Sequence, residues 1–392
     1  MFFEFDDYDL LKAKIKVVGV GGAGGNALNR MIEDSLMGVE FLAVNTDAQD
    51  LDNNLSEVKI QIGQALTKGL GAGADTNLGR QAVEENQEAI EQALRGADMV
   101  FITAGMGGGT GTGAAPHIAR IAKRLGCLTI GIVTRPFNFE GRHRAQRADI
   151  GIEELRRHCD TTLVIPNETL LRITDPGTTF TEALILADSI LHQATRGISD
   201  LINIHGLINL DFADVRTVML DMGDAILGTG IGHGEERAIL AAQQAISSPL
   251  LQDTNISGAR GLLVNVTGDS TMTLHEVNDA ASIINEEAGE DANVIFGAVI
   301  DDRLTDEFRV TVIATGFNSN GRSEQAENAL DAKAEALAAS LKSDLPDAEI
   351  PAYQRDHLLG EIENDRPLPE DPNGAVYGND LDVPAILRAR LS

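Results

Sequence analysis

Residues 105–113 read Gly-Met-Gly-Gly-Gly-Thr-Gly-Thr-Gly, and six of these nine residues are glycine. The stretch follows an apolar run, Met99–Thr103, and precedes a helical pattern that begins at Ala114. A glycine loop between a strand and a helix exposes backbone N–H groups, and the start of the helix favours negative charge. The pattern predicts a phosphate-binding loop rather than a linker, because linkers seldom lie between a buried strand and a helix.

The chain has 392 residues, with 31 basic and 60 acidic residues and a formal net charge of −29. Duplex DNA and anionic membranes are polyanions, so this charge argues against either as a direct partner. The only cysteines are Cys127 and Cys159, which excludes a disulfide scaffold and fits a reducing cytosol. The acidic N-terminus does not resemble a signal peptide, and no apolar run reaches the ~20 residues of a membrane span.

Over the first half of the chain, strand patterns alternate with helical patterns, which is typical of a doubly wound, mostly parallel sheet. The predicted strands are 14–20, 40–45, 58–62, 99–103, 128–134 and 162–165. Residues 180–203 predict one long helix that joins two domains. Its apolar stripe recurs at spacings of three and four and consists of Leu184, Ala187, Leu191, Ala194, Ile198 and Leu201.

The second half predicts a different α/β layer, a sheet with helices on one face. Its predicted helices are 214–222, 234–246 and 274–287, and its predicted strands are 261–267, 293–299 and 309–315. From residue 318 to the end, 15 acidic residues stand against 7 basic ones and no phenylalanine occurs. Such a segment buries too little apolar surface to fold, so a disordered linker is predicted. The final residues turn apolar and basic, which favours a docking peptide.

Two further glycine motifs accompany the opening stretch. Gly19, Gly21 and Gly24 form a Gly-x-Gly-x-x-Gly pattern, and Asp47 follows where a dinucleotide fold places its ribose-binding carboxylate. Alone, this motif favours an NAD enzyme. A third loop, 69–73, also precedes a helical pattern. Three glycine loops at successive strand-to-helix junctions exceed what a dinucleotide fold requires, and they favour one nucleotide whose phosphates are wrapped on several sides.

Three sets of charged residues allow more than one interpretation. Arg144 could offset phosphate charge, and Glu140 could accept hydrogen bonds from ribose hydroxyls. A solvated surface turn explains the presence of these two charged residues equally well. Asp211 and Asp214 could orient a water molecule or hold a cation. From the residues alone, a helix start explains this Asp-x-x-Asp pattern better. Asp188 flanks the apolar stripe of the long helix, where a polar residue is usually solvated.

Residues 107–113 match the signature of the tubulin/FtsZ family, and the chain resembles the bacterial cell-division branch of that family. The resemblance covers residues 14–317 and continues at 382–388, through segments 21–26, 45–47, 69–73, 137–141, 165–167, 209–219 and 309–317. The third loop departs from the family's usual Asn-Pro-Glu, because Asp75, Thr76 and Asn77 stand there. Ala23 replaces a glycine of the first loop.

The resemblance implies a site for GTP or GDP in which Asn26 and Asp188 contact the guanine base, since its N1–H and amino group favour a carboxylate acceptor. The implied site consists of Gly21, Gly22, Ala23, Gly24, Gly25, Asn26, Asp47, Gly71, Ala72, Gly73, Gly107, Gly108, Gly109, Thr110, Gly111, Thr112, Glu140, Arg144, Asn167 and Asp188. It also implies that Asn209, Asp211 and Asp214 reach the GTP of the next subunit and position the attacking water and a Mg²⁺ ion, so that hydrolysis occurs at a head-to-tail contact.

The implied activity is GTP hydrolysis by a filament that forms the Z ring at the bacterial division site, in the cytoplasm at midcell on the inner face of the membrane. The implied organisation is an N-terminal extension (1–13), a GTP-binding domain (14–178), a central helix (179–205), a GTPase-activating domain (206–317), a linker (318–380) and a partner-binding peptide (381–392). That peptide would bind membrane-tethering and regulatory division proteins (FtsA-, ZipA- and MinC-like) through Asp382, Pro384, Ile386, Leu387 and Arg388.

Two other functions remain open at this point. A nicotinamide dehydrogenase would use the Gly19–Gly24 motif, but no His/Asp or Tyr/Lys arrangement occurs at a convincing spacing for it. A nucleotide-binding scaffold that polymerises without hydrolysis would use the same glycine loops and would not need Asp211 and Asp214.

Overall fold

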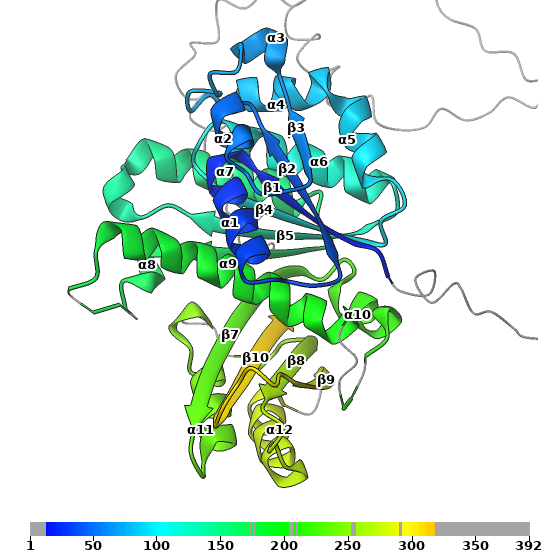
Figure 1. Cartoon of the computed structure of the whole chain (residues 1–392), viewed down its shortest axis with the longest axis vertical. Coiled ribbons are helices and arrows are strands. Elements are labelled where there is room, and N and C mark those ends of the chain that lie inside the picture. The colour runs from blue at the N-terminus through cyan, green and yellow to red at the C-terminus, as the bar shows by residue number, and fades with distance from the viewer. Residues whose placement is uncertain are drawn as a thin grey trace, which may run out of the picture. The chain divides into compact units, whose positions relative to one another are not determined.

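One continuous sheet runs through the computed structural model, which describes residues 13–172, 174–175, 177–203, 207–208, 210–251, 256–289 and 292–317. Its strand order in the described part of the chain is β3-β2-β1-β4-β5-β6-β7-β10-β8-β9 (Figure 1). The strands are β1 (Ile15–Val20), β2 (Val39–Asn45), β3 (Val58–Gln61), β4 (Met99–Gly105), β5 (Leu128–Arg135), β6 (Thr161–Pro166), β7 (Gly223–His233), β8 (Gly261–Gly268), β9 (Asn293–Ile300) and β10 (Glu307–Thr315).

In the order of the sheet, the seven strands from β3 through β2, β1, β4, β5 and β6 to β7 pair in parallel. Strand β10 runs antiparallel to both β7 and β8, and β8 and β9 are parallel. The helices are α1 (Gly21–Glu33), α2 (Ala48–Asp52), α3 (Gln64–Thr67), α4 (Thr76–Glu85), α5 (Gln87–Leu94), α6 (Thr110–Arg124), α7 (Arg142–Arg156), α8 (Asn167–Leu170), α9 (Phe180–Asn203), α10 (Phe212–Met219), α11 (Arg237–Ile246) and α12 (Leu274–Ala288), with short 3₁₀ turns η2 (Asn138–Glu140) and η3 (Pro249–Leu251).

Helices cover both faces of the parallel half of the sheet, as the alternating pattern predicts. Successive side chains of a strand point to opposite faces. Val17 of β1 packs in the cluster formed with α1 and α9, whereas its neighbour Val18 packs in the cluster formed with α4, α5, α6 and α7. The expected doubly wound architecture is therefore confirmed.

Helix α9 lies between the two halves of the molecule and has the predicted bounds. It packs against α1 and β5 on one side and against β8 and β9 on the other (Figure 1). Five residues of its predicted apolar stripe are buried, but Leu184 is 40% exposed. The prediction for Leu184 is wrong because the first turns of α9 extend past the sheet.

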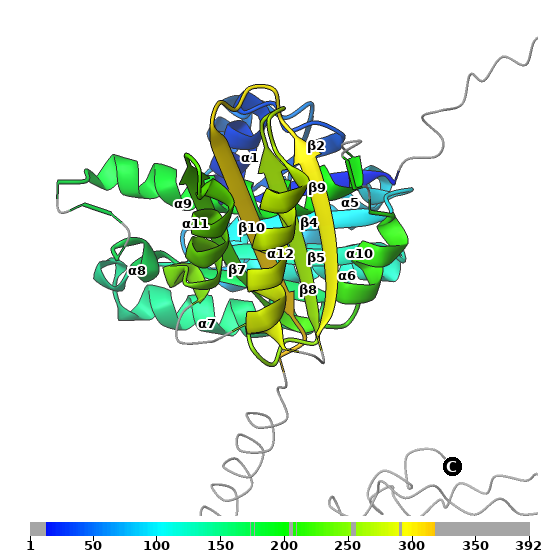
Figure 2. The same cartoon turned by 90° about the horizontal axis from the view of Figure 1, so that it is seen from below.

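Helices α11 and α12 lie side by side over one face of β7, β10 and β8 (Figure 2). The sequence pattern gave no strand at residues 223–233, yet β7 is the longest strand in the described part of the chain. Glycines replace apolar residues on its α11-facing side: a Cβ added at Gly230 would lie 2.0 Å from the Ala241 carbonyl oxygen, and one at Gly232 would lie 1.9 Å from the Arg237 oxygen. Because the α11 backbone packs closely on these glycines, the strand lacks the apolar alternation that would indicate it in the sequence.

Candidate nucleotide site

The carboxyl ends of five parallel strands meet at one edge of the sheet. These ends are Val20, Asn45, Gly105, Arg135 and Pro166, and each is followed directly by a segment that contains predicted site residues. Ligands of open α/β sheets bind outside this edge. The topology therefore collects the dispersed motifs at one place.

The first glycine motif forms the opening turns of α1 rather than a separate loop. Gly21 has φ = +73°, and a Cβ there would lie 3.0 Å from the Gly111 backbone nitrogen. A Cβ at Gly24 would lie 2.5 Å from the Thr103 carbonyl oxygen. These glycines allow α1 to begin directly against β4 and the start of α6, so two helix N-termini lie close together.

Within the opening stretch, 105–113, only residues 106–109 are loop, because Gly105 ends β4. Helix α6 begins at Thr110, four residues before the predicted start, because a Cβ at Gly113 would lie 2.0 Å from the Thr76 carbonyl oxygen and glycine allows the close packing of α6 on α4. The Thr112 hydroxyl accepts from the Gly107 backbone N–H at 2.7 Å, which fixes the turn.

The third glycine loop contacts the other two regions. A Cβ at Gly109 would lie 2.9 Å from the Ala72 Cβ, and Gly71, with φ = +82°, lies beside the Asp47 side chain. Asp47 caps α2, because its Oδ1 accepts from the Gln49 N–H at 2.9 Å. The three predicted glycine loops are thus brought together.

Asp75, which departs from the family's pattern, caps helix α4. Its Oδ1 accepts from the backbone N–H groups of Asn77 and Leu78 at 2.9 and 3.4 Å. The carboxylate therefore has a local structural role at the start of this helix.

A cavity of ≈ 190 Å³ opens beside the first glycine motif and Asn26. Several of its lining residues were not singled out from the sequence. Asn45 donates to Asp50 Oδ2 at 3.1 Å, and Asn54 donates to the Gly25 carbonyl oxygen at 2.9 Å. Sequence alone gives no signal for Asp50 and Asn54, because they lie in α2 and just after it and approach Gly22 and Gly25 only in space.

One sequence signal for this region was missed. The buried Thr46 hydroxyl lies 2.6 Å from the Thr110 hydroxyl and so ties the end of β2 to the phosphate loop. Its place in the motif Asn45-Thr46-Asp47 could have indicated it.

The segment after β5 carries Glu140 and Arg144, which form an ion pair with 3.1 Å between Oε2 and Nε. Glu140 also accepts from the Phe137 backbone N–H at 2.9 Å. A Cβ at Gly107 would lie 2.7 Å from the Arg144 Cγ, so Arg144 borders the phosphate loop. Asn167 follows β6 with its Oδ1 buried and without a hydrogen bond among the described residues.

Asp188 is half-buried on α9, and burial raises the pKa of its carboxyl group to about 6 against a small opposing effect of the Arg30 guanidinium. Arg30 lies one turn beyond Asn26 on α1, and α1 packs on α9. The solvated position expected from the residues alone is therefore wrong. The side chain is instead a partly desolvated carboxylate on the helix that packs against α1.

Asp211 and Asp214 are exposed at the start of α10, and Asp214 Oδ2 accepts from the Asp211 backbone N–H at 3.3 Å. The helix-start interpretation is thus borne out locally. Helix α10 leads into β7, which begins opposite Thr161, the first residue of β6. The acidic pair is therefore placed at the amino edge of the parallel strands, and the glycine loops at the carboxyl edge. Figure 1 shows this separation: α8, which directly follows the carboxyl end of β6, lies on the left, and α10 lies on the right.

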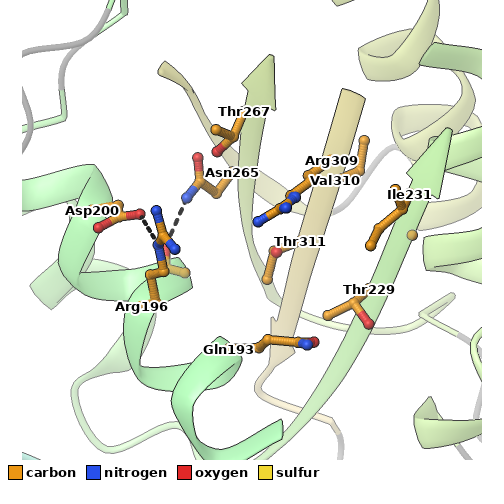
Figure 3. Close-up of a pocket in the computed structure, with 12 residues that line it drawn as sticks. Gln193, Arg196, Asp200, Thr229, Ile231, Asn265, Thr267, Arg309, Val310 and Thr311 are labelled. Atoms are coloured by element: carbon orange, nitrogen blue, oxygen red, sulfur yellow. Dashed lines mark hydrogen bonds and ion pairs between the residues drawn. The ribbon is translucent and has the colours of Figure 1, made fainter. Parts of the chain in front are cut away.

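A second cavity, of ≈ 200 Å³, separates α9 from strands β7, β8 and β10 (Figure 3). On α9, Arg196 pairs with Asp200 of the same helix at 3.0 Å, and Asn265 of β8 donates to the Gly197 carbonyl oxygen at 3.3 Å. None of the glycine loops lines this cavity, so it is separate from the candidate nucleotide site.

Several predicted residues lie outside the described part of the chain, namely Asn209, Asp382, Pro384, Ile386, Leu387 and Arg388. The described residues contain no group of three or more His, Cys, Asp or Glu side chains arranged to hold a metal ion. No helix among them is long and apolar enough to cross a bilayer. Cys127 and Cys159 are free and buried, and burial raises the pKa of the Cys159 thiol to about 12.

Comparison with known proteins agrees with this geometry. Residues 14–175 match the family model of the Tubulin/FtsZ family, GTPase domain, and residues 223–318 match that of the FtsZ family, C-terminal domain. An empty FtsZ dimer of M. jannaschii is 43% identical, with a TM-score of 0.76, over 81% of this chain and 94% of that one. A GTPγS-bound protofilament of CetZ2 from Haloferax volcanii, 22% identical over 82% of this chain and 99% of that one, shares the fold with a TM-score of 0.65.

Fold and sequence together define a tubulin-like GTPase domain followed by a second α/β domain. The chain belongs to the Tubulin/FtsZ family. Family membership removes the dehydrogenase interpretation of the Gly19–Gly24 motif.

Proposed function

We propose that this chain binds GTP at the carboxyl edge of its sheet and hydrolyses it where two copies meet head to tail. The backbone N–H groups at the starts of α1 and α6 hold the phosphates, where two helix N-termini favour negative charge. Asn26 and Asp188 recognise guanine. The half-buried Asp188 carboxylate supports this role, because burial disfavours its charge and a bound guanine would supply hydrogen-bond donors to it.

The observation that carries the proposal is the separation of the acidic pair from the glycine loops. Helix α6 begins in the phosphate loop and ends near the amino edge, where Lys123 pairs with Asp221 beyond α10. Its 15 residues span about 22 Å. Asp211 and Asp214 thus lie too far from the loops of their own chain, whereas a copy stacked head to tail would bring them there. Such a heterologous contact repeats along a filament.

At that contact, Asp211 and Asp214 accept hydrogen bonds from the attacking water and orient it toward the γ-phosphate, and Asn209 adds an amide. Both carboxylates are exposed and are therefore available to a neighbour. Carboxylate oxygens, phosphate oxygens and water suit Mg²⁺, which needs only one or two protein carboxylates. When bound, Mg²⁺ neutralises charge on the phosphates. Hydrolysis weakens the contact, so that filaments turn over.

The cellular role that fits these parts is the Z ring of bacterial cell division, on the cytoplasmic side of the membrane at midcell. Residues 318–380 serve as a tether, and the peptide 381–392 recruits membrane-tethering and regulatory division proteins of the FtsA, ZipA and MinC kind. The chain then reaches the membrane only through these partner proteins. Its net charge of −29, which disfavours direct contact with anionic lipids, is compatible with such indirect binding.

The variant Asp214→Ala tests this proposal, with Asp224→Ala as its matched control. Asp224 is also an exposed aspartate near the amino edge, but it pairs with Arg156. Asp214→Ala should bind GTP as the wild type does and lose phosphate release about 100-fold or more, the contribution expected of a group that orients and activates water. Lost GTP binding, or unchanged turnover, would contradict the division of the site between two copies.

A further inference from the structure

The last turn of α10 is held by two buried hydroxyl groups from different parts of the sheet. The final carbonyl groups of a helix lack intrahelical partners. The Thr315 hydroxyl of β10 donates to the Val218 carbonyl oxygen at 2.7 Å, and the Thr161 hydroxyl of β6 donates to the Met219 carbonyl oxygen. Both threonines are 1% exposed. The C-terminal end of α10 is therefore fixed to both halves of the sheet.

A third side chain holds the turn that follows α10. The Lys123 ammonium group lies 2.8 Å from Asp221 Oδ1 and 3.0 Å from Asp160 Oδ1. Asp160 is 2% exposed and also accepts from the Thr129 backbone N–H at 2.8 Å. The carboxylate that pairs with Lys123 is therefore held in a fixed position. Asp221 has the left-handed backbone conformation, φ = +52°, and its hydrogen bond with Lys123 lowers the pKa of its carboxyl group.

The other end of α10 carries the acidic pair. Both carboxylates are exposed, and Asp214 Oδ2 accepts from the Asp211 backbone N–H at 3.3 Å. Helix α10 has eight residues and is about 12 Å long, so it transmits the orientation of its fixed end to its exposed end. Its buried face, which includes Val215, sets its rotation.

We propose that Thr161, Thr315 and Lys123, which we call the α10 anchor, are positioning residues for GTP hydrolysis. They hold α10 so that Asp211 and Asp214 present their carboxylates to the nucleotide of the adjoining copy. This inference rests on the proposed function. It adds that residues about two helical turns from the acidic pair, and remote from the bound GTP of either copy, determine the rate of the hydrolysis step.

The test compares Thr315→Val with Thr315→Ser in the full chain. Valine removes the hydroxyl at nearly constant volume, whereas serine keeps it. The matched control is Thr311→Val on the same strand, whose side chain faces Gly197 on α9 rather than α10. We expect Thr315→Val to lower kcat for phosphate release about 10- to 100-fold, because small displacements of catalytic groups have effects of this size. GTP affinity should be unchanged, Thr315→Ser should recover most of kcat, and Thr311→Val should match the wild type.

Asp214→Asn, measured in parallel, separates this inference from the function on which it rests. If Asp214→Asn hydrolyses GTP normally, the proposed function fails. If Asp214→Asn is slow but Thr315→Val is as fast as the wild type, the α10 anchor is wrong. The loss in the double variant should be smaller than the product of the two single losses, because both changes act through the acidic pair. A further, multiplicative loss would overturn the inference.

A second variant covers the case in which Thr315→Val does not fold. Asp221→Asn changes a side chain that is 70% exposed, and asparagine tolerates the left-handed conformation. It removes the charge that holds Lys123 to the turn after α10, where at most a neutral hydrogen bond can remain, and leaves the Lys123–Asp160 pair intact. A lower kcat with unchanged GTP affinity supports the inference, and an unchanged kcat contradicts it.

Discussion

The Asp188→Asn variant should be more stable than the wild-type protein without nucleotide and should bind GTP more weakly. Burial raises the pKa of the Asp188 carboxyl group from 3.8 to about 6 in the folded protein. A carboxyl group whose folded pKa lies above its unfolded value destabilises the fold wherever it is ionised. The cost is therefore absent below about pH 4, grows as the pH rises through 6, and is full at pH 8.

The size of this effect follows from the two pKa values. Each pKa unit corresponds to about 1.4 kcal/mol, so at pH 8 the ionised Asp188 costs at most about 3 kcal/mol, with about half of that at pH 5. Asparagine avoids this cost. It also cannot accept both guanine donors as a carboxylate does, and loss of a charge-assisted hydrogen bond should weaken GTP binding about 10- to 100-fold.

Urea unfolding of nucleotide-free protein at pH 5 and pH 8 measures the first effect, and GTP titration at pH 8 measures the second. Ser189→Ala is the control, because Ser189 is adjacent but donates to the Ile185 carbonyl oxygen of its own helix. The reasoning is refuted if the stability gained by Asp188→Asn does not increase between pH 5 and pH 8. Unchanged GTP affinity would remove Asp188 from the guanine site.

Two further predictions concern packing and docking. Gly113→Ala should destabilise the protein by about 3 kcal/mol or more in urea unfolding, because its Cβ would lie 2.0 Å from the Thr76 carbonyl oxygen, whereas Gly108→Ala, with no atom within 4 Å, should change stability little. Equal effects of the two changes would show that α6 and α4 are not closely packed there. Arg388→Ala should leave GTP hydrolysis unchanged and weaken the binding of a membrane-tethering division protein to the full chain, and unchanged partner affinity would argue against the terminal peptide as the docking site.

Local patterns predicted the elements well where packing follows periodicity. The bounds of α9 and the positions of β1, β2, β4, β5 and β6 follow from apolar spacing. Strand β7 was not predicted because glycines stand where a strand pattern has apolar side chains. These glycines let the α11 backbone pack closely against the strand. The start of α6 was misplaced because Thr110–Gly113 has a poor helical propensity that tight packing on α4 overcomes.

For the candidate site too, the sequence predicted the local motifs but not how they come together in space. Each glycine loop was visible in the sequence: two stand directly after a strand, and 69–73 stands before the helical pattern of α4, with α3 between it and β3. Their meeting depends on the parallel order of β2, β1 and β4, which no local pattern contains. The same holds for Asp50 and Asn54, which approach the first loop from α2 and the turn after it. The placement of α10 at the opposite edge follows only from the pairing of β6 with β7.

The dependence of GTP hydrolysis on protein concentration tests the shared site most directly. Phosphate release with GTP and Mg²⁺ is measured across protein concentrations, and sedimentation with GTP and with GDP is followed in the same samples. If the acidic pair acts on the nucleotide of the next copy, the rate per subunit should rise with concentration and level off as the protein sediments with GTP but not with GDP. A rate per subunit that stays constant, including where no polymer sediments, would contradict the account.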